Sequence, residues 1–306
     1  MSNRWWIYQK ERFPLFAHGT LILVFCLSVM FFSSLQQEPL EMPSLLRIGG
    51  AMFSTVILFF QLRVADEFKD FDIDRQYRPH RPVPRGLVSL RELATLAYLG
   101  AAVQFAIALY VDVGLVPVLV GVWLYLGLMT KEFFVPDWLR RTPIVYLFSH
   151  MLIMPMITFY VSAFDWLCDC RAVPQGLSWL LVLSFCCGLV LELGRKIRIP
   201  EHERRGVETY SGLWGTDIAV SFWVIAVVAA VTAYILAVHF IADAGVHVPL
   251  AVIVLFLAFF TAICFPQNDE DDFRQLAEKL IEPSSGLVAL LLYGGLGPLQ
   301  ALLGQS

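Results

Sequence analysis

The sequence predicts an all-α protein that crosses a membrane several times, and its composition and its pattern of apolar residues both support this fold class. Of its 306 residues, 58% are hydrophobic and only 16% are charged, against about 25% charged in an ordinary soluble domain. The apolar residues form continuous runs that do not alternate with polar ones, so a membrane β-barrel is not indicated. A formal net charge of −4 offers no basic surface for nucleic acid.

Nine apolar stretches are long enough to form transmembrane helices, each of which needs about 20 residues. They follow one another along the whole chain, so residues 1–306 are predicted to form a single transmembrane domain. The stretches are 14–35, 44–65, 90–111, 114–130, 144–165, 176–194, 215–240, 246–265 and 286–304.

The basic residues lie almost entirely on one side of this nine-helix arrangement. Nineteen of the 22 Lys and Arg residues lie on this side: they fall in the N-terminal segment, in the connections after the second, fourth, sixth and eighth stretches, or, for Arg91, at the adjoining start of the third stretch. Short loops rich in Lys and Arg remain in the cytoplasm. The N-terminus and these loops are therefore predicted to be cytoplasmic, and the C-terminus external.

The connection after the second stretch, residues 66–89, carries four carboxylates at helical spacing. If the second helix continues past the membrane edge, all four project from one face. Carboxylates stacked in this way repel one another, and Mg²⁺ would neutralise them, since it binds one or two carboxylates together with water and phosphate oxygens. The alternative is a solvated acidic helix end that pairs with neighbouring arginines. The four residues are Asp66, Glu67, Asp70 and Asp74.

Three arginines follow in a segment whose prolines prevent a continuous helix. They are Arg78, Arg81 and Arg85. The planar guanidinium group suits bidentate contact with phosphate. Metal-binding carboxylates next to phosphate-binding arginines indicate a diphosphate ligand.

This first motif resembles the signature of the UbiA superfamily of intramembrane prenyltransferases, which is Asn-Asp-x-x-Asp-x-x-x-Asp followed by Arg-Pro-x-x-Pro and Gly. The matching residues are Asp66, Glu67, Asp70 and Asp74, then Arg81, Pro82, Pro84, Arg85 and Gly86. One departure is Asp66-Glu67 in place of Asn-Asp, which keeps an acid where a metal ligand is expected. The resemblance covers nearly the whole chain and implies a nine-helix bundle with a lipid-open central cavity.

The connection after the sixth stretch, residues 192–214, departs from the family pattern. Relatives carry two or three aspartates there that bind a second Mg²⁺, whereas this segment contains no aspartate. Glu192 and Glu201 could still ligate a metal. The segment keeps the family's Gly-x-x-Thr ending, from Gly206 to Thr209.

Basic residues occupy several positions of this second motif where the family has acids. Arg195, Lys196 and Arg198 could replace the second cation and neutralise the leaving group directly. A loop that simply anchors the protein at the lipid headgroups is the alternative.

The resemblance also implies roles for individual residues. Lys131 directly follows the fourth stretch, at a place where relatives have a basic group that holds diphosphate. Tyr125 and His150 are candidates to line the acceptor cavity, and His150 should face the bundle interior because a polar group is costly in lipid. The implied catalytic residues are Asp70, Asp74, Lys131 and Arg195; the diphosphate-binding residues are Arg78, Arg81, Arg85, Lys131, Arg195, Lys196 and Arg198; and the metal ligands are Asp66, Glu67, Asp70, Asp74, Glu192 and Glu201.

The function implied by the resemblance is Mg²⁺-dependent transfer of a prenyl group from a prenyl diphosphate to a lipophilic, aromatic acceptor within the membrane. Membrane lipids are the other expected partners. One alternative is transfer of a phosphoribosyl group or another phosphate ester to a lipid phosphate. Another is a transporter or a non-catalytic protein that binds phospholipid or a divalent cation. Against transport, the charged residues cluster at the membrane edge, whereas transporter sites lie near the midplane.

The charge asymmetry makes a testable prediction about topology. A reporter fused after Ser306 should be external, and one inserted at Gly86 should be cytoplasmic, because positively charged loops are retained inside. Reporter activity in intact cells measures both positions. A cytoplasmic reporter at Ser306 would contradict the nine-span arrangement.

Overall fold

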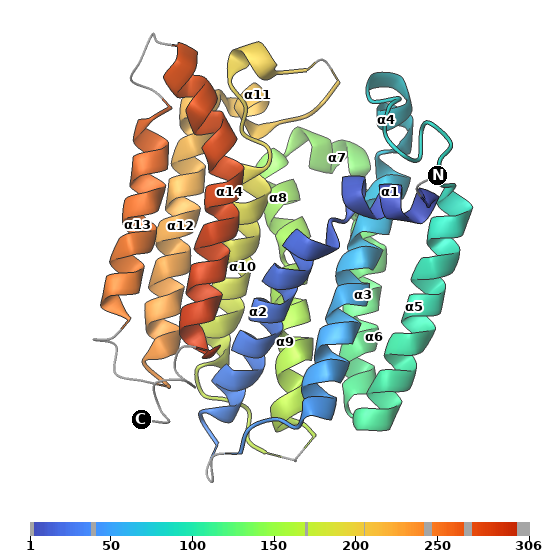
Figure 1. The fold of residues 1–306 in the computed structure, drawn as a ribbon, viewed down its shortest axis with the longest axis vertical. Coiled ribbons are helices and arrows are strands. Elements are labelled where there is room, and N and C mark those ends of the chain that lie inside the picture. Colours follow the sequence, from blue (N-terminus) through green and yellow to red (C-terminus); the bar gives the residue numbers. More distant parts are fainter. Residues whose placement is uncertain are drawn as a thin grey trace.

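The computed structural model describes residues 3–37, 41–168, 171–204, 206–241, 247–265 and 271–298, and within these ranges every regular element is a helix. The prediction of an all-α fold is therefore confirmed. The long helices pack side by side into one bundle whose axes run roughly in the same direction (Figure 1).

In the part of the chain that the structure describes, five helical segments are long and apolar enough to cross a membrane. They are α3 (Leu45–Lys69), α5 (Leu90–Val111), the pair α8 and α9 (Pro143–Met151 and Ile153–Trp166), α10 (Leu177–Gly194) and α12 (Thr216–Val238). The remaining long helices are α2 (Leu15–Ser34), α6 (Leu115–Thr130), α13 (Val248–Ile263) and α14 (Asp271–Leu296). The apolar parts of α2, α6 and α13 are shorter, so the count of nine crossings stays a prediction.

Short helices gather at one end of the bundle, at the top of Figure 1. They are α1 (Arg4–Arg12), α4 (Phe71–Tyr77), α7 (Pro136–Arg141) and α11 (Tyr210–Trp214), together with the 3₁₀ turns η1 (Glu132–Phe134) and η2 (Pro200–His202). We call this the motif end, because it carries both predicted motifs, residues 66–89 and 192–214. The cytoplasmic location of this end stays a prediction, and the predicted external C-terminus lies outside the described residues.

The fifth apolar stretch is divided into two helices instead of forming one. Helix α8 ends at Met151, and α9 begins at Ile153. Pro155 lies in the first turn of α9 and lacks the N–H that would bond to the Met151 carbonyl, which accounts for the break. The break separates a short segment at the motif end, which contains His150, from the buried length of α9.

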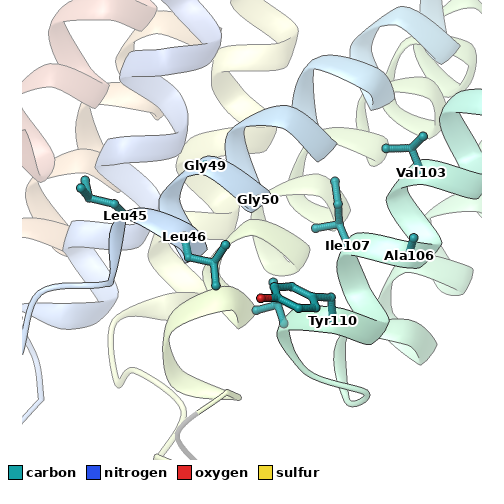
Figure 2. Close-up of a pocket in the computed structure, with 9 residues that line it drawn as sticks. Leu45, Leu46, Gly49, Gly50, Val103, Ala106, Ile107 and Tyr110 are labelled. Atoms are coloured by element: carbon teal, nitrogen blue, oxygen red, sulfur yellow. The ribbon is translucent and has the colours of Figure 1, made fainter.

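Two cavities of the described chain lie away from the motif end. One is an apolar groove of about 460 Å³ between the start of α3 and the end of α5, where Gly49 and Gly50 leave the helix surface low (Figure 2). The other is a polar pocket of about 200 Å³ beside Arg47 and Asp165. Neither is the central cavity implied by the resemblance, so that cavity stays a prediction.

Candidate active site

The first acidic motif does not form one continuous helical face. Helix α3 ends at Lys69, Asp70 has a non-helical backbone (φ −89°, ψ 0°), and α4 begins at Phe71. The break changes the direction of the chain between Glu67 and Asp74. The four carboxylates consequently do not share one environment.

Two of these carboxylates are buried and already paired with arginine. Glu67 lies 2.5 Å from Nε of Arg12, which α1 supplies. Asp74 lies 2.7 Å from Nε of Arg78 and 2.6 Å from Nη1 of Arg81. Since an ionised group in a low-dielectric interior needs a partner, these contacts explain how both carboxylates are buried. Arg78 and Arg81, which were predicted to bind phosphate, hold Asp74 in this structure.

The other two carboxylates are only half-buried. Asp66 is 3.4 Å from Arg63 on the same helix. The Asp70 carboxylate makes no hydrogen bond or ion pair with any described residue, and only its backbone is bonded, to Asp66 and Asp74. Burial raises the pKa of Asp70 above its ordinary value, and the Asp66 carboxylate raises it further. This residual negative charge is suited to a cation.

The Asp66–Asp70 pair suits Mg²⁺ in an open site, which water and phosphate complete, better than a metal enclosed by protein ligands alone. Among the residues that the structure describes, no group of three or more His, Cys, Asp or Glu side chains could hold a metal. A cation at Asp66 and Asp70 would therefore have two protein ligands, with water and phosphate oxygens completing its shell. That is the coordination Mg²⁺ adopts in phosphate-binding sites.

The second motif places two positive charges on one buried carboxylate. Glu192, in the last turn of α10, lies 2.5 Å from Nε of Arg195 and 3.0 Å from Nζ of Lys196. The Glu192 carboxylate raises the pKa of Arg195, and Asp66 of the first motif contributes to the increase. Glu192 cancels one of the two positive charges, so this group carries a net positive charge.

The two motifs face each other across the motif end. The positive charge of Lys196 partly offsets the burial that raises the pKa of Asp70, and the negative charge of Asp66 adds to the effect of Glu192 in raising the pKa of Arg195. The loops also touch directly at Gly206, whose φ of 77° suits glycine. A Cβ at this position would lie 2.3 Å from the Tyr77 ring of α4. An acidic pair therefore lies opposite a basic pair.

Two predicted residues of the second motif lie in other surroundings. Arg198 lies 3.6 Å from Glu278 of α14 and donates to backbone carbonyls of its own loop. Glu201 is exposed in η2 and pairs with no described residue. Their roles in diphosphate and metal binding stay predictions.

Helix α1 fastens the first motif loop to the bundle. Besides the Arg12 contact, Glu11 lies 2.9 Å from Arg85, and Arg4 lies 2.6 Å from Glu92 at the start of α5. Tyr8 is buried in a small apolar cluster with Val83 and residues of α3 and α5. Arg85, a predicted phosphate ligand, also donates to the His80 carbonyl at 2.8 Å. No pattern of residues in the sequence indicates that α1 pairs with this loop.

The turn after α6 contributes a residue that sequence reasoning missed. Lys131 is exposed and pairs with no described residue, whereas the adjacent Glu132 is buried and lies 3.6 Å from Lys69. The residues of η1 have φ values of 47°, 53° and 61°, a left-handed conformation that is costly for residues other than glycine. This conformation turns Glu132 towards Lys69. The predicted role of Lys131 in catalysis and diphosphate binding is untested.

The two predicted cavity residues lie in an aromatic cluster beside this turn. Tyr125 donates to the Ser149 carbonyl at 2.6 Å, and its ring meets Phe133 with centroids 5.6 Å apart. His150 is stacked on Tyr146, and the Tyr146 hydroxyl contacts Lys69. This cluster connects α8 with the end of α3, next to the first motif.

Comparison with known proteins assigns the chain to a family. A model of the UbiA prenyltransferase family matches residues 14–298, while no protein of curated function matches the chain. The apo structure of a UbiA homologue from Aeropyrum pernix K1 is similar with a TM-score of 0.69 at 14% identity, covering 93% of this chain and 98% of that one. A UbiA homologue from Archaeoglobus fulgidus bound to DMAPP and Mg²⁺ gives 0.59 at 12% identity, covering 94% and 99%. A structure of digeranylgeranylglyceryl phosphate synthase gives 0.59 at 16% identity, covering 92% and 98%.

The buried pair between α1 and α3 makes a prediction about stability. Arg12→Ala leaves the Glu67 carboxylate buried without a partner, which costs about 3–5 kcal/mol. Lys10→Ala, on an exposed position of the same helix, should have little effect. Thermal unfolding of both variants in detergent measures the difference, and Glu67→Gln in the Arg12→Ala background should restore part of it. Equal unfolding temperatures for the two single variants would contradict the assignment.

Proposed function

Because the chain belongs to the UbiA prenyltransferase family, we propose that it transfers a prenyl group from a prenyl diphosphate to a lipophilic, aromatic acceptor within the membrane, with Mg²⁺ as its cofactor. Homologues from Archaeoglobus fulgidus bind DMAPP or GPP together with Mg²⁺, which supports both the donor class and the metal. The apolar bundle supplies surroundings in which the donor's tail and a lipophilic acceptor can meet.

The observation that carries this proposal is the opposition of two charge pairs at the motif end. Asp66 and Asp70 would hold one Mg²⁺ against the donor's phosphates. Arg195 and Lys196 would donate hydrogen bonds to the same diphosphate from the other side. Together they surround a leaving group whose negative charge grows as it departs. Bound Mg²⁺ would withdraw electron density from the diphosphate and so promote its release.

Glu192 has a positioning role in this scheme. It is buried and contacts both Arg195 and Lys196, so it fixes these flexible side chains before the donor binds. Fixed donors are effective because no reorganisation is needed when charge develops. A single Mg²⁺ suffices here, since the covalently attached cations supply the positive charge that a second metal provides elsewhere.

The alternative reaction, transfer of a phosphoribosyl group or another phosphate ester to a lipid phosphate, would use the same charge pairs. The two reactions differ in the group attached to the donor's diphosphate, which is a prenyl chain in one and a phosphoribosyl group in the other. Competition between a prenyl diphosphate and a phosphoribosyl diphosphate for the purified protein therefore distinguishes them, and the apolar bundle favours the prenyl donor.

The half-buried, unpaired carboxylate of the first motif gives the functional test. Asp70→Asn should reduce Mg²⁺-dependent diphosphate release from a labelled prenyl diphosphate by at least about 100-fold, because it removes a fixed electrostatic partner of the reacting group. Asp72→Asn is the matched control, since Asp72 is an exposed carboxylate on the neighbouring turn. Both variants should unfold at the wild-type temperature.

Two outcomes would contradict the proposed function. One is diphosphate release that persists in excess chelator. The other is equal loss of activity in Asp70→Asn and Asp72→Asn, which would indicate that the loop as a whole matters and the cation-binding position does not.

A further inference from the structure

His150 is held in one orientation at the motif end. Its side chain is buried, and the residue is only 8% exposed. The ring stacks on Tyr146 with centroids 3.9 Å apart and planes 19° apart, and the Phe133 ring meets it edge-on at 6.0 Å. Nδ1 lies 2.9 Å from the Tyr146 carbonyl oxygen. A ring constrained on its face, its edge and one nitrogen cannot turn freely.

These contacts decide which nitrogen carries the proton. A carbonyl oxygen only accepts hydrogen bonds, so Nδ1 must donate, and the neutral ring then has its lone pair on Nε2. Ser149 Oγ is 3.4 Å from Nδ1, but it lies closer to the same Tyr146 carbonyl, at 3.1 Å, and donates there. The tautomer is therefore fixed by the backbone of α8.

No described residue uses the lone pair of Nε2. This atom is buried and has no hydrogen-bond partner among the described residues. A buried acceptor that lacks a partner costs free energy, and a ligand that donates a hydrogen bond would remove that cost. The geometry therefore points to a bound group with an O–H or N–H.

The position of the ring relates it to the proposed reaction. The charged groups within electrostatic range of His150 come from both motifs: Lys69 and Asp66 from the first, Glu192 and Lys196 from the second. The ring thus lies within electrostatic range of one member of each proposed pair, Asp66 of the cation-binding pair and Lys196 of the basic pair.

Five carboxylates lie where the two motifs meet, and each has an assigned partner, so among the described residues around them His150 is the candidate base. Arginine or lysine pairs with three of them, and the other two would hold the cation. The paired carboxylates are those of Glu67, Asp74 and Glu192, and the cation-holding ones are those of Asp66 and Asp70.

We propose that Nε2 of His150 accepts the proton of a hydroxyl group on the prenyl acceptor, which makes the acceptor a phenol or an enol. This inference rests on the proposed function and specifies its acceptor. As the bond between C1 of the prenyl group and the diphosphate oxygen breaks, its electron pair leaves with the diphosphate. The O–H bonding pair enters the acceptor's conjugated system, whose nucleophilic atom forms the new bond to C1. The proton passes to Nε2, and the imidazolium later returns it to solvent.

The first test measures the tautomer and does not depend on turnover. The full chain, labelled with ¹⁵N in its histidine rings, is placed in lipid nanodiscs, and the His150 signals are assigned by their loss in His150→Gln. Nδ1 should be protonated and Nε2 unprotonated, and a long-chain alkylphenol should shift the Nε2 signal whereas its methyl ether should not. A proton on Nε2, or equal responses to the phenol and the ether, would overturn the proposal.

The second test separates acceptor chemistry from donor binding. His150→Gln should reduce transfer of a labelled prenyl group to the alkylphenol by at least about 100-fold, as expected for loss of a general base, with unchanged Mg²⁺-dependent donor binding. His239→Gln is the control, since His239 is exposed at the C-terminal end of α12, away from the motif end. Wild-type transfer by His150→Gln, or a parallel loss of donor binding, would overturn the role of His150. Absence of donor binding in the wild type would count against the proposed function, and the tautomer measurement would still decide on His150.

Discussion

Charged side chains buried at the end of an apolar bundle must be neutralised, and the motif end of this protein is organised around that requirement. Ionised groups in a low-dielectric interior cost several kcal/mol each unless a partner compensates them. Arg12 reaches Glu67 from α1, Arg78 and Arg81 enclose Asp74, and Arg195 and Lys196 enclose Glu192. The Arg12–Glu67 pair joins α1 to α3, and the other pairs order the chain within each motif. Pairing of charge therefore shapes the local structure of the motif end.

The same requirement identifies the groups that are left for function. Asp66 and Asp70 keep negative charge that the described chain does not fully neutralise, and Nε2 of His150 is a buried acceptor without a partner. Opposite them, the second motif carries one more positive charge than negative. In the proposed function, a diphosphate with one Mg²⁺ would pair with the charged groups, and a hydroxyl-bearing acceptor would donate a hydrogen bond to the histidine. Binding of both substrates would thus supply partners for the polar groups that have none, or only a weak one, in the folded chain.

The sequence was informative where the signal is local and periodic. Continuous apolar runs predicted the long helices, and the spacing of the first motif predicted where charge gathers. It was uninformative where the outcome depends on contacts between distant segments. Nothing in the order of residues shows that α3 breaks at Asp70, that Arg12 is committed to Glu67, or that Arg198 pairs with Glu278. The left-handed turn at Glu132 contains no glycine that would indicate it in the sequence. The sequence therefore points to the exposed Lys131 and not to its buried neighbour.

The substitution of fixed cations for a second metal is tested most directly by counting bound Mg²⁺. Isothermal titration of the purified protein with Mg²⁺, in the presence of a non-hydrolysable prenyl diphosphate analogue, should give one site per chain. That site should be lost in Asp66→Asn and Asp70→Asn and kept in Glu192→Gln and Glu201→Gln. Two sites of similar affinity, one of which disappears in Glu192→Gln or Glu201→Gln, would contradict the substitution and show that the second motif binds a metal of its own.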